Sequence, residues 1–209
     1  MTLKLHRPAP IAAVSIALLL ALTGCQGPST PSSSPSPTAS KASPTPDASK
    51  PTPASSAGPA RNIPVPELPE AATKETKEGL RVFADYWLSL MNYGFTTGDY
   101  GPVNKLTASG CETCANIQKG VPETYKSGGW FVGGELAIKS YSDSFRPDIN
   151  DTYGPLMRIS QSSRAKYDKT GKVLESHTAD AGEKNIYVLY SRFQNGAWRV
   201  ADFGLPGGS

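Results

Sequence analysis

Hydrophobic residues divide this chain into three parts. Residues 11–22 form an apolar run interrupted only by Ser15, and residues 26–62 contain no Val, Leu, Ile, Met or aromatic residue. Apolar residues return periodically from residue 63 onward. A segment without apolar side chains cannot offset the entropy lost on folding. The pattern predicts a leader over residues 1–24, a disordered Ser/Pro/Thr-rich tether over residues 25–62, and one domain over residues 63–209.

Helical spacing dominates the first part of the predicted domain. An apolar face runs through Leu80, Phe83, Trp87, Leu88, Leu90 and Met91. The spacing predicts a helix over residues 73–93, with Thr73 as its N-cap and Gly94 at its end. Two shorter helices are expected, one near residues 102–106 and one over residues 114–125 that is interrupted at Gly120.

A strand pattern follows from Trp130 to Phe203. Strands are expected over residues 130–141, 156–167, 172–176, 184–193 and 198–203, with a bend or bulge at Gly133 and Gly134. Asn195-Gly196 is a strong hairpin signal. Helices followed by a meander of strands predict an α+β fold, in which N-terminal helices pack on a curved antiparallel sheet.

The leader has the features of a secretory signal peptide. Lys4, His6 and Arg7 precede the apolar run, which is shorter than the roughly 20 residues of a membrane-spanning helix. Leu22-Thr23-Gly24-Cys25 resembles the lipobox of bacterial lipoproteins. That resemblance implies cleavage before Cys25, lipidation of its sulfur and a place on the extracytoplasmic side of the cell membrane. The alternative is an ordinary secretory signal with an accidental cysteine.

The charge of the chain bears on whether it could bind nucleic acid. The chain has 21 Lys and Arg residues against 18 Asp and Glu residues, for a net charge of +3. Part of this excess lies in the leader and the tether, so the predicted domain is close to neutral. A nucleic-acid-binding domain needs a basic stripe, and the sequence has none.

Cys111 and Cys114 form a C-x-x-C motif with three interpretations. A redox site of this type usually follows a strand in a β-α-β unit, and here Ser109 and Gly110 precede it. A zinc site needs two more ligands, and only His177 remains after the leader. A structural disulfide is therefore expected, because an exported protein meets an oxidising environment. We expect no metal and no cofactor.

The candidate catalytic residues are few. His177 lies in a polar stretch that predicts a solvated loop. The carboxylates nearest to apolar segments are Asp85, Asp99 and Asp202. Because Asp202 alternates with Trp198 and Val200, it could point inward as a general base. No G-x-S-x-G nucleophile motif is present.

The order of elements resembles the cone-shaped domains of the nuclear-transport-factor-2-like superfamily. A narrower resemblance, over about residues 67–203, is to a family of uncharacterised actinobacterial lipoproteins. It rests on Gly79–Phe83, Tyr86-Trp87, Asn92-Tyr93, Thr97–Asp99, Cys111–Cys114, Tyr125 and Gly128-Gly129. The resemblance implies a fold and a location, but not an activity, because the superfamily holds enzymes, binding domains and adaptors.

We therefore expect a non-enzymatic binding or interaction module without catalytic residues, attached to the membrane through Cys25. Its partner would be a cell-envelope protein or a small apolar ligand, and not a nucleic acid. The alternative is a hydrolase, isomerase or dehydratase acting on a small envelope metabolite. An enzyme needs polar groups that converge inside the cone. A binding site can instead be lined by strand aromatics, of which the sequence offers Trp130, Phe131, Tyr141, Tyr187, Tyr190 and Trp198.

Overall fold

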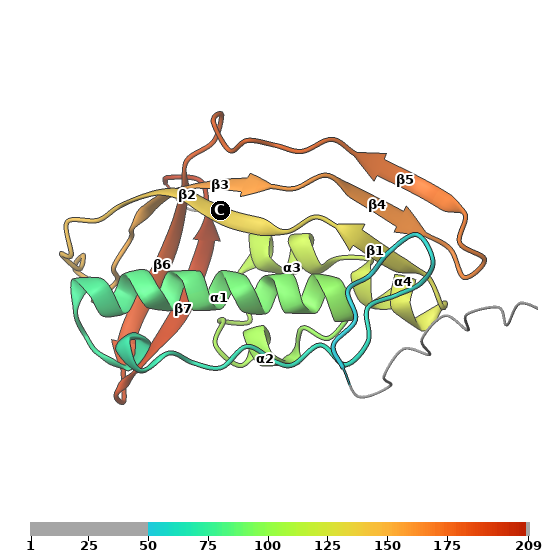
Figure 1. Ribbon diagram of the computed structural model, residues 1–209. Helices are drawn as coiled ribbons and strands as arrows, with labels where there is room; N and C mark the ends of the chain where they lie inside the picture. The colour runs from blue at the N-terminus through green and yellow to red at the C-terminus, as the bar shows by residue number, and fades with distance from the viewer. Residues whose placement is uncertain (1–49, 208–209) are drawn as a thin grey trace, which may run out of the picture. The chain divides into compact units, whose positions relative to one another are not determined.

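A computed structural model describes residues 50–207 of the chain. The fold is α+β, with the helices first and the strands after them, as the sequence predicts (Figure 1). The predicted leader, with Cys25, and most of the predicted tether lie outside the described residues.

The long helix α1 spans Lys77–Thr97, later than the predicted 73–93. Thr76 is its N-cap, because its hydroxyl accepts from the Gly79 amide at 2.9 Å. Gly94 lies inside the helix, where the Tyr100 ring packs so closely that a Cβ would meet its Cδ1 at 2.2 Å. Gly98, with φ of 80°, ends the helix instead. Gly94 thus serves close packing, and the chain terminates the helix one turn later.

In the part of the chain that the structure describes, three short helices and a 3₁₀ turn accompany α1. The turn η1 spans Glu70–Thr73 and precedes the helix, and it ends at Thr73, the residue that the sequence predicts as the N-cap of α1. Helix α2 spans Gly101–Asn104, α3 spans Glu112–Gln118 and α4 spans Val121–Lys126. The break between α3 and α4 falls at the Gly120 position that the sequence indicates.

Within residues 50–207, seven strands form two antiparallel sheets. The bounds are β1 Trp130–Gly133, β2 Leu136–Ser142, β3 Leu156–Gln161, β4 Arg164–Tyr167, β5 Val173–His177, β6 Tyr187–Gln194 and β7 Ala197–Gly204. The strand order is β1-β4-β5 in one sheet and β2-β3-β6-β7 in the other. The sequence predicts one meander, and the structure differs because β3 pairs with β6 while β4 pairs with β5.

The two sheets meet at a bend. There the chain passes from β1 to β2 and from β3 to β4, so each of the two long predicted strands is divided in two. Gly133 and Gly134 have φ of 72° and 82°, which favour glycine. The amide of Gly134 donates to the Ser163 carbonyl, and the amide of Ser162 donates to the Glu135 carbonyl, so pairing continues across the bend. A Cβ on Gly133 would lie 2.0 Å from that Ser163 oxygen. The predicted bend at Gly133–Gly134 is therefore the point that divides the sheet.

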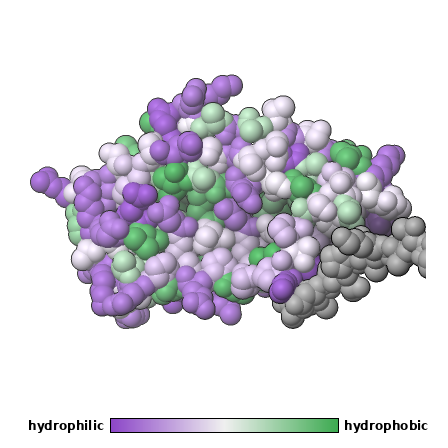
Figure 2. All heavy atoms as spheres, in the orientation of Figure 1, coloured by the Kyte–Doolittle hydropathy of each residue, from purple (hydrophilic) through white to green (hydrophobic). Residues whose placement is uncertain are grey.

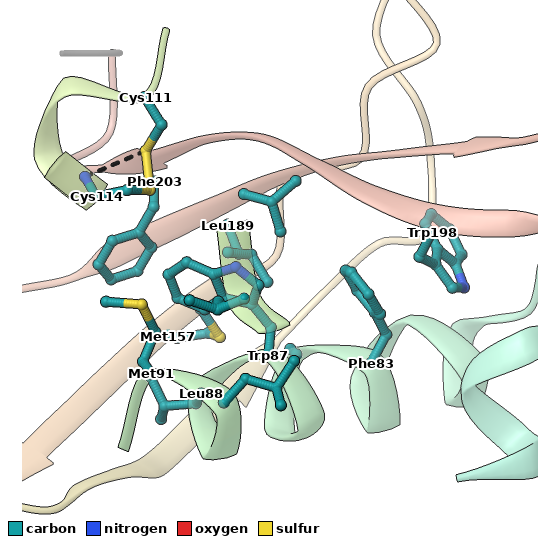
Figure 3. Close-up of a cluster of buried hydrophobic side chains, with 14 of the residues drawn as sticks. Phe83, Trp87, Leu88, Met91, Cys111, Cys114, Met157, Leu189, Trp198 and Phe203 are labelled. Carbon is teal, nitrogen blue, oxygen red and sulfur yellow. Dashed lines mark hydrogen bonds between the residues drawn. A yellow bond between two sulfur atoms is a disulfide. The ribbon is translucent and has the colours of Figure 1, made fainter. Parts of the chain in front are cut away.

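The core lies between α1 and the four-stranded sheet. Figure 3 shows Phe83, Trp87 and Met91 of α1 pointing toward side chains of β3, β6 and β7. Phe203 lies 5.1 Å from Trp87 between ring centroids, and Trp198 lies 6.2 Å from Phe83. On the face of the molecule in Figure 2, hydrophobic residues form small separate areas among hydrophilic ones. Most of the apolar face of α1 is thus used for packing inside the domain.

Residues 50–62 differ from the predicted tether. They form a narrow hairpin, in which Thr52 pairs with Arg61 and Ser55 with Gly58 (Figure 1). The carbonyl of Ser55 accepts a 2.8 Å hydrogen bond from the indole Nε1 of Trp130. This contact with a buried tryptophan orders a segment that has no large apolar side chain of its own. The ordered chain therefore begins before Ile63.

Candidate functional site

A cavity of about 450 Å³ lies where the two sheets meet. Its walls come from the end of α1, the α3–α4 segment and strands of both sheets. They are formed by Phe95, Asn116, Ile117, Lys119, Gly120, Val121, Phe131, Leu136, Ile159, Gln161, Arg164, Lys166, Glu175, Asp180, Tyr187 and Phe203. The volume lies within the range of about 300–1,000 Å³ that is typical of small-molecule sites.

The floor of the cavity is aromatic and aliphatic. The rings of Phe95 and Phe131 lie 4.6 Å apart between centroids, and Tyr187 stacks on Phe203 at 5.4 Å. Ile159 is buried beside them, at 8 % exposure. These residues come from α1, β1, β3, β6 and β7, so only the folded domain brings them together.

A side-chain amide holds one edge of this floor in place. Asn92 on α1 donates from Nδ2 to the Leu136 carbonyl and accepts at Oδ1 from the Leu136 amide, both at 2.9 Å. These two bonds imitate the pairing of a neighbouring strand. They fix the start of β2 against α1, and thereby fix the position of the Leu136 side chain in the cavity.

One wall of the cavity carries charged residues from β4 and β5. In the strand register Lys166 lies opposite both Phe131 and Glu175, and Arg164 lies opposite His177. Because directly opposed residues share one face of a sheet, these side chains gather on one side. The Lys166 Nζ lies 5.8 Å from the centre of the Phe131 ring. Charge and aromatic surface are thus neighbours at this wall.

Glu175 is the carboxylate in the middle of this wall. Its Oε1 contacts the Nε2 of His177. The hydrogen bond to His177 lowers the pKa of Glu175, and the charges of His177, Arg164 and Lys166 lower that pKa further. Glu175 therefore stays ionised near neutral pH, and its charge is partly compensated by its neighbours.

Two of the predicted catalytic candidates have local structural roles away from the cavity. Asp85 forms a salt bridge with Arg81 on the exposed face of α1, with Oδ2 and Nε 3.3 Å apart. The Oδ1 of Asp99 accepts from the Gly101 amide at 2.8 Å in the turn before α2. Neither lines the cavity.

Asp202 does not take the inward position that alternation along β7 predicts. A β-bulge leaves Ala201 between the pairs Tyr190–Asp202 and Ser191–Val200. The extra residue reverses the alternation, so Phe203 joins the cavity floor. Asp202 instead borders a surface hollow with Tyr190 and Arg192, and its Oδ1 accepts from the Phe203 amide at 2.8 Å.

His177 lies on a strand, where the sequence predicts a loop. It is the last residue of β5, and its side chain is 46 % exposed. The other predicted aromatics divide between several surfaces. Phe131 and Tyr187 line the cavity, and Trp198 is in the core. Trp130 contacts the hairpin, Tyr190 lies beside Asp202, and Tyr141 packs beneath the Arg81 guanidinium of α1.

Cys111 and Cys114 are joined by a disulfide in the structure, as the sequence predicts. Both residues are buried, at 2 % and 3 % exposure, and Cys111 is the N-cap of α3 (Figure 3). Within residues 50–207, no group of three His, Cys, Asp or Glu residues is arranged to hold a metal ion. Over the same residues, no helix is both long and apolar enough to cross a bilayer.

Arg164 and Lys166 are among the site residues that the sequence does not single out. They alternate with Ala165 and Tyr167 on β4, so the period of two places both cations on one face. That signal is present in the sequence. It does not show that this face lines a cavity, because the opposing wall comes from α1 and the α3–α4 segment.

The fold and the site define a class of protein, an α+β domain with an open cavity of aromatic floor and charged wall. The chain belongs to the family of unknown function DUF6318, which matches residues 50–203. A crystal structure of the intermembrane space region of the chloroplast protein ARC6 is similar at a TM-score of 0.37 and 10 % identity. That similarity covers 62 % of this chain and 95 % of the other. No curated protein matches the chain.

Proposed function

We propose that this protein is an extracytoplasmic lipoprotein whose domain binds a small ligand with an apolar part and does not catalyse its conversion. The cavity at the junction of the sheets carries this proposal, because two aromatic pairs, Phe95 with Phe131 and Tyr187 with Phe203, contribute to its lining. None of the four candidates that the sequence offered, Asp85, Asp99, His177 and Asp202, lines the cavity, and His177 reaches it only through its contact with Glu175. That distribution favours binding over catalysis.

The location and the finer fold are part of the same proposal. Lipidation of Cys25 would attach the chain to the cell membrane, since two or three acyl chains bind a bilayer firmly. The helices before a bent antiparallel sheet, with a cavity at the bend, support a nuclear-transport-factor-2-like domain. A lipoprotein of this kind would hold its cavity outside the cell.

The anchor is tested by replacing Cys25. The Cys25→Ser protein should leave the membrane fraction or remain unprocessed, and it should take up no label from a fatty-acid analogue supplied to the cells. Retention of that label by the variant would refute lipidation at Cys25.

The binding site is tested with N-phenyl-1-naphthylamine, an uncharged aromatic probe whose fluorescence rises in apolar sites. The chain from Gln26 to Ser209 retains every described residue and is the form to titrate. Ile117→Gln places an amide at the cavity and should weaken probe binding about threefold to tenfold, the loss expected for one apolar contact. Ile186→Gln is the matched control, because Ile186 lies outside the cavity at 37 % exposure, against 36 % for Ile117. Equal effects of the two substitutions would contradict the proposal.

A further inference from the structure

The two cations on the cavity wall have unused hydrogen-bond donors. Arg164 and Lys166 are half-buried, and neither side chain forms a hydrogen bond or a salt bridge within residues 50–207. The Arg164 side chain starts beside Gly134 at the sheet bend, with its Cβ 3.3 Å from the position of a Cβ on that glycine. A guanidinium and an ammonium therefore flank the aromatic floor with their donors available.

The carboxylates of the same cavity are already engaged. Glu175 contacts His177, and the Oδ1 of Asp180 accepts from the Gly182 amide at 2.8 Å. On the opposite side of the cavity Lys119 adds a third cation. The cavity is consequently better suited to a negative than to a positive group of a ligand.

The charged wall lies next to the aromatic floor, and this determines which kind of ligand would fit the cavity. Lys166 lies over the Phe131 ring, and Phe131 packs on Phe95. A group bound to the ammonium of Lys166 and the guanidinium of Arg164 would therefore be adjacent to the aromatic floor. We propose that the cavity binds an amphipathic anion, with its acidic group on Arg164 and Lys166 and its apolar body on the floor that includes Phe131. This inference rests on the proposed binding function and specifies the class of ligand.

A matched pair of probes tests the charge requirement. 8-Anilinonaphthalene-1-sulfonate has the aromatic body of N-phenyl-1-naphthylamine with one added sulfonate. The sulfonate probe should bind about tenfold more tightly to the chain from Gln26 to Ser209, the effect of one charge-assisted hydrogen bond. Equal binding of the two probes would overturn the anion proposal and leave the binding function standing. If neither probe binds, the proposed function itself fails.

Removal of a cation from the charged wall and removal of its carboxylate should have opposite effects on the affinity for the sulfonate probe. Arg164→Gln and Lys166→Gln should each weaken the sulfonate probe about threefold to tenfold and leave the neutral probe unchanged. Glu175→Gln removes the negative charge between these cations, so it should tighten the sulfonate probe. Lys77→Gln and Glu78→Gln, exposed at the start of α1, are the matched controls and should have no effect. Weakening of both probes alike by the wall variants would contradict the proposal.

Competition then identifies the apolar body. Dodecanoate and 1-naphthoate both carry a carboxylate, on an acyl chain and on an aromatic ring respectively. Displacement of the bound sulfonate probe by the first assigns an acyl ligand, and displacement by the second assigns an aromatic acid. Either result supports an amphipathic anion, whereas displacement by neither would overturn it.

Discussion

Ala201 decides which of its neighbours faces the interior. Without the bulge at this residue, simple alternation from Trp198 and Val200 would place Asp202 inside and Phe203 outside. With it, Phe203 is buried at 4 % exposure and stacks on Tyr187 in the cavity floor. A bulge of this kind has no distinct sequence signal in Val200-Ala201-Asp202, so the period of two gives the wrong face.

Adjacent substitutions test this assignment. Asp202→Asn should leave the free energy of unfolding and the binding of the neutral probe unchanged, since Asn can still accept the hydrogen bond from the Phe203 amide. Phe203→Leu should cost about 1–2 kcal/mol of stability, because the two aromatic contacts of Phe203 are lost. It should also weaken probe binding. Urea unfolding and probe titration measure both effects, and loss of binding by a stable Asp202→Asn protein would place Asp202 in the site.

The hairpin of residues 50–62 shows how contacts with a distant part of the chain can order a segment. Its composition predicts disorder, and its own side chains offer little to bury. Order comes from two backbone bridges, Thr52–Arg61 and Ser55–Gly58, and from Trp130, seventy-five residues later in the sequence than Ser55, whose indole donates to the Ser55 carbonyl. Composition carries no signal of long-range contacts of this type, which explains why the sequence predicts a tether where the structure has a hairpin.

Removal of the hairpin should expose Trp130. A chain that begins at Ile63 should be about 1–3 kcal/mol less stable than one that begins at Lys50, through loss of one hydrogen bond and of apolar burial. The tryptophan fluorescence of the shorter chain should shift to the red and be quenched more by acrylamide. Chains of equal stability with equally protected tryptophans would show that the hairpin contributes nothing.

Other elements were predictable to different degrees. The apolar face of α1, the break near Gly120 and the bend at Gly133 follow from local chemistry, and the structure has all three. The position at which α1 ends does not follow from local chemistry, because Gly94 and Gly98 are both suitable caps. The contacts at these two glycines come from residues outside the helix, since the Tyr100 ring packs on Gly94 and the Tyr125 ring packs on Gly98.

At the scale of the whole molecule, the cavity depends on contacts between distant segments. Its floor and wall draw on residues from Phe95 to Phe203, and no continuous motif contains them. The sequence predicted aromatic residues inside the domain, and two of these, Phe131 and Tyr187, line the cavity. The charged wall was not predicted, because the register of β4 against β1 and β5 creates it.

Tyrosines join the helical layer and make stability depend on pH. The Tyr125 hydroxyl on α4 contacts the carbonyls of Phe95 and Thr96 on α1, at 3.1 and 2.6 Å. Burial raises the pKa of Tyr125 to about 12, and burial also raises the pKa of Tyr100. A phenol with a raised pKa stabilises the fold fully below its ordinary pKa near 10, and this contribution is lost as pH rises through the folded value.

The domain should therefore lose stability between about pH 10 and pH 12, by up to about 2–3 kcal/mol from Tyr125. Tyr125→Phe should be about 1 kcal/mol less stable at neutral pH, because the contacts to the α1 carbonyls are gone. The same variant should lose less stability over the alkaline range. Urea unfolding at a series of pH values measures this, and parallel curves for the two proteins would show that Tyr125 does not contribute.

The hairpin also determines how the domain would respond to force. With Cys25 held in a membrane, as proposed, tension along the chain reaches the domain at Lys50. The pairs Thr52–Arg61 and Ser55–Gly58 would then open one after the other, and the bond from Trp130 would follow. Their release frees roughly 40 Å of extended chain before the load reaches α1. Residues 50–62 would thus act as a mechanical buffer that spares the cavity when tension acts on the anchored end of the chain.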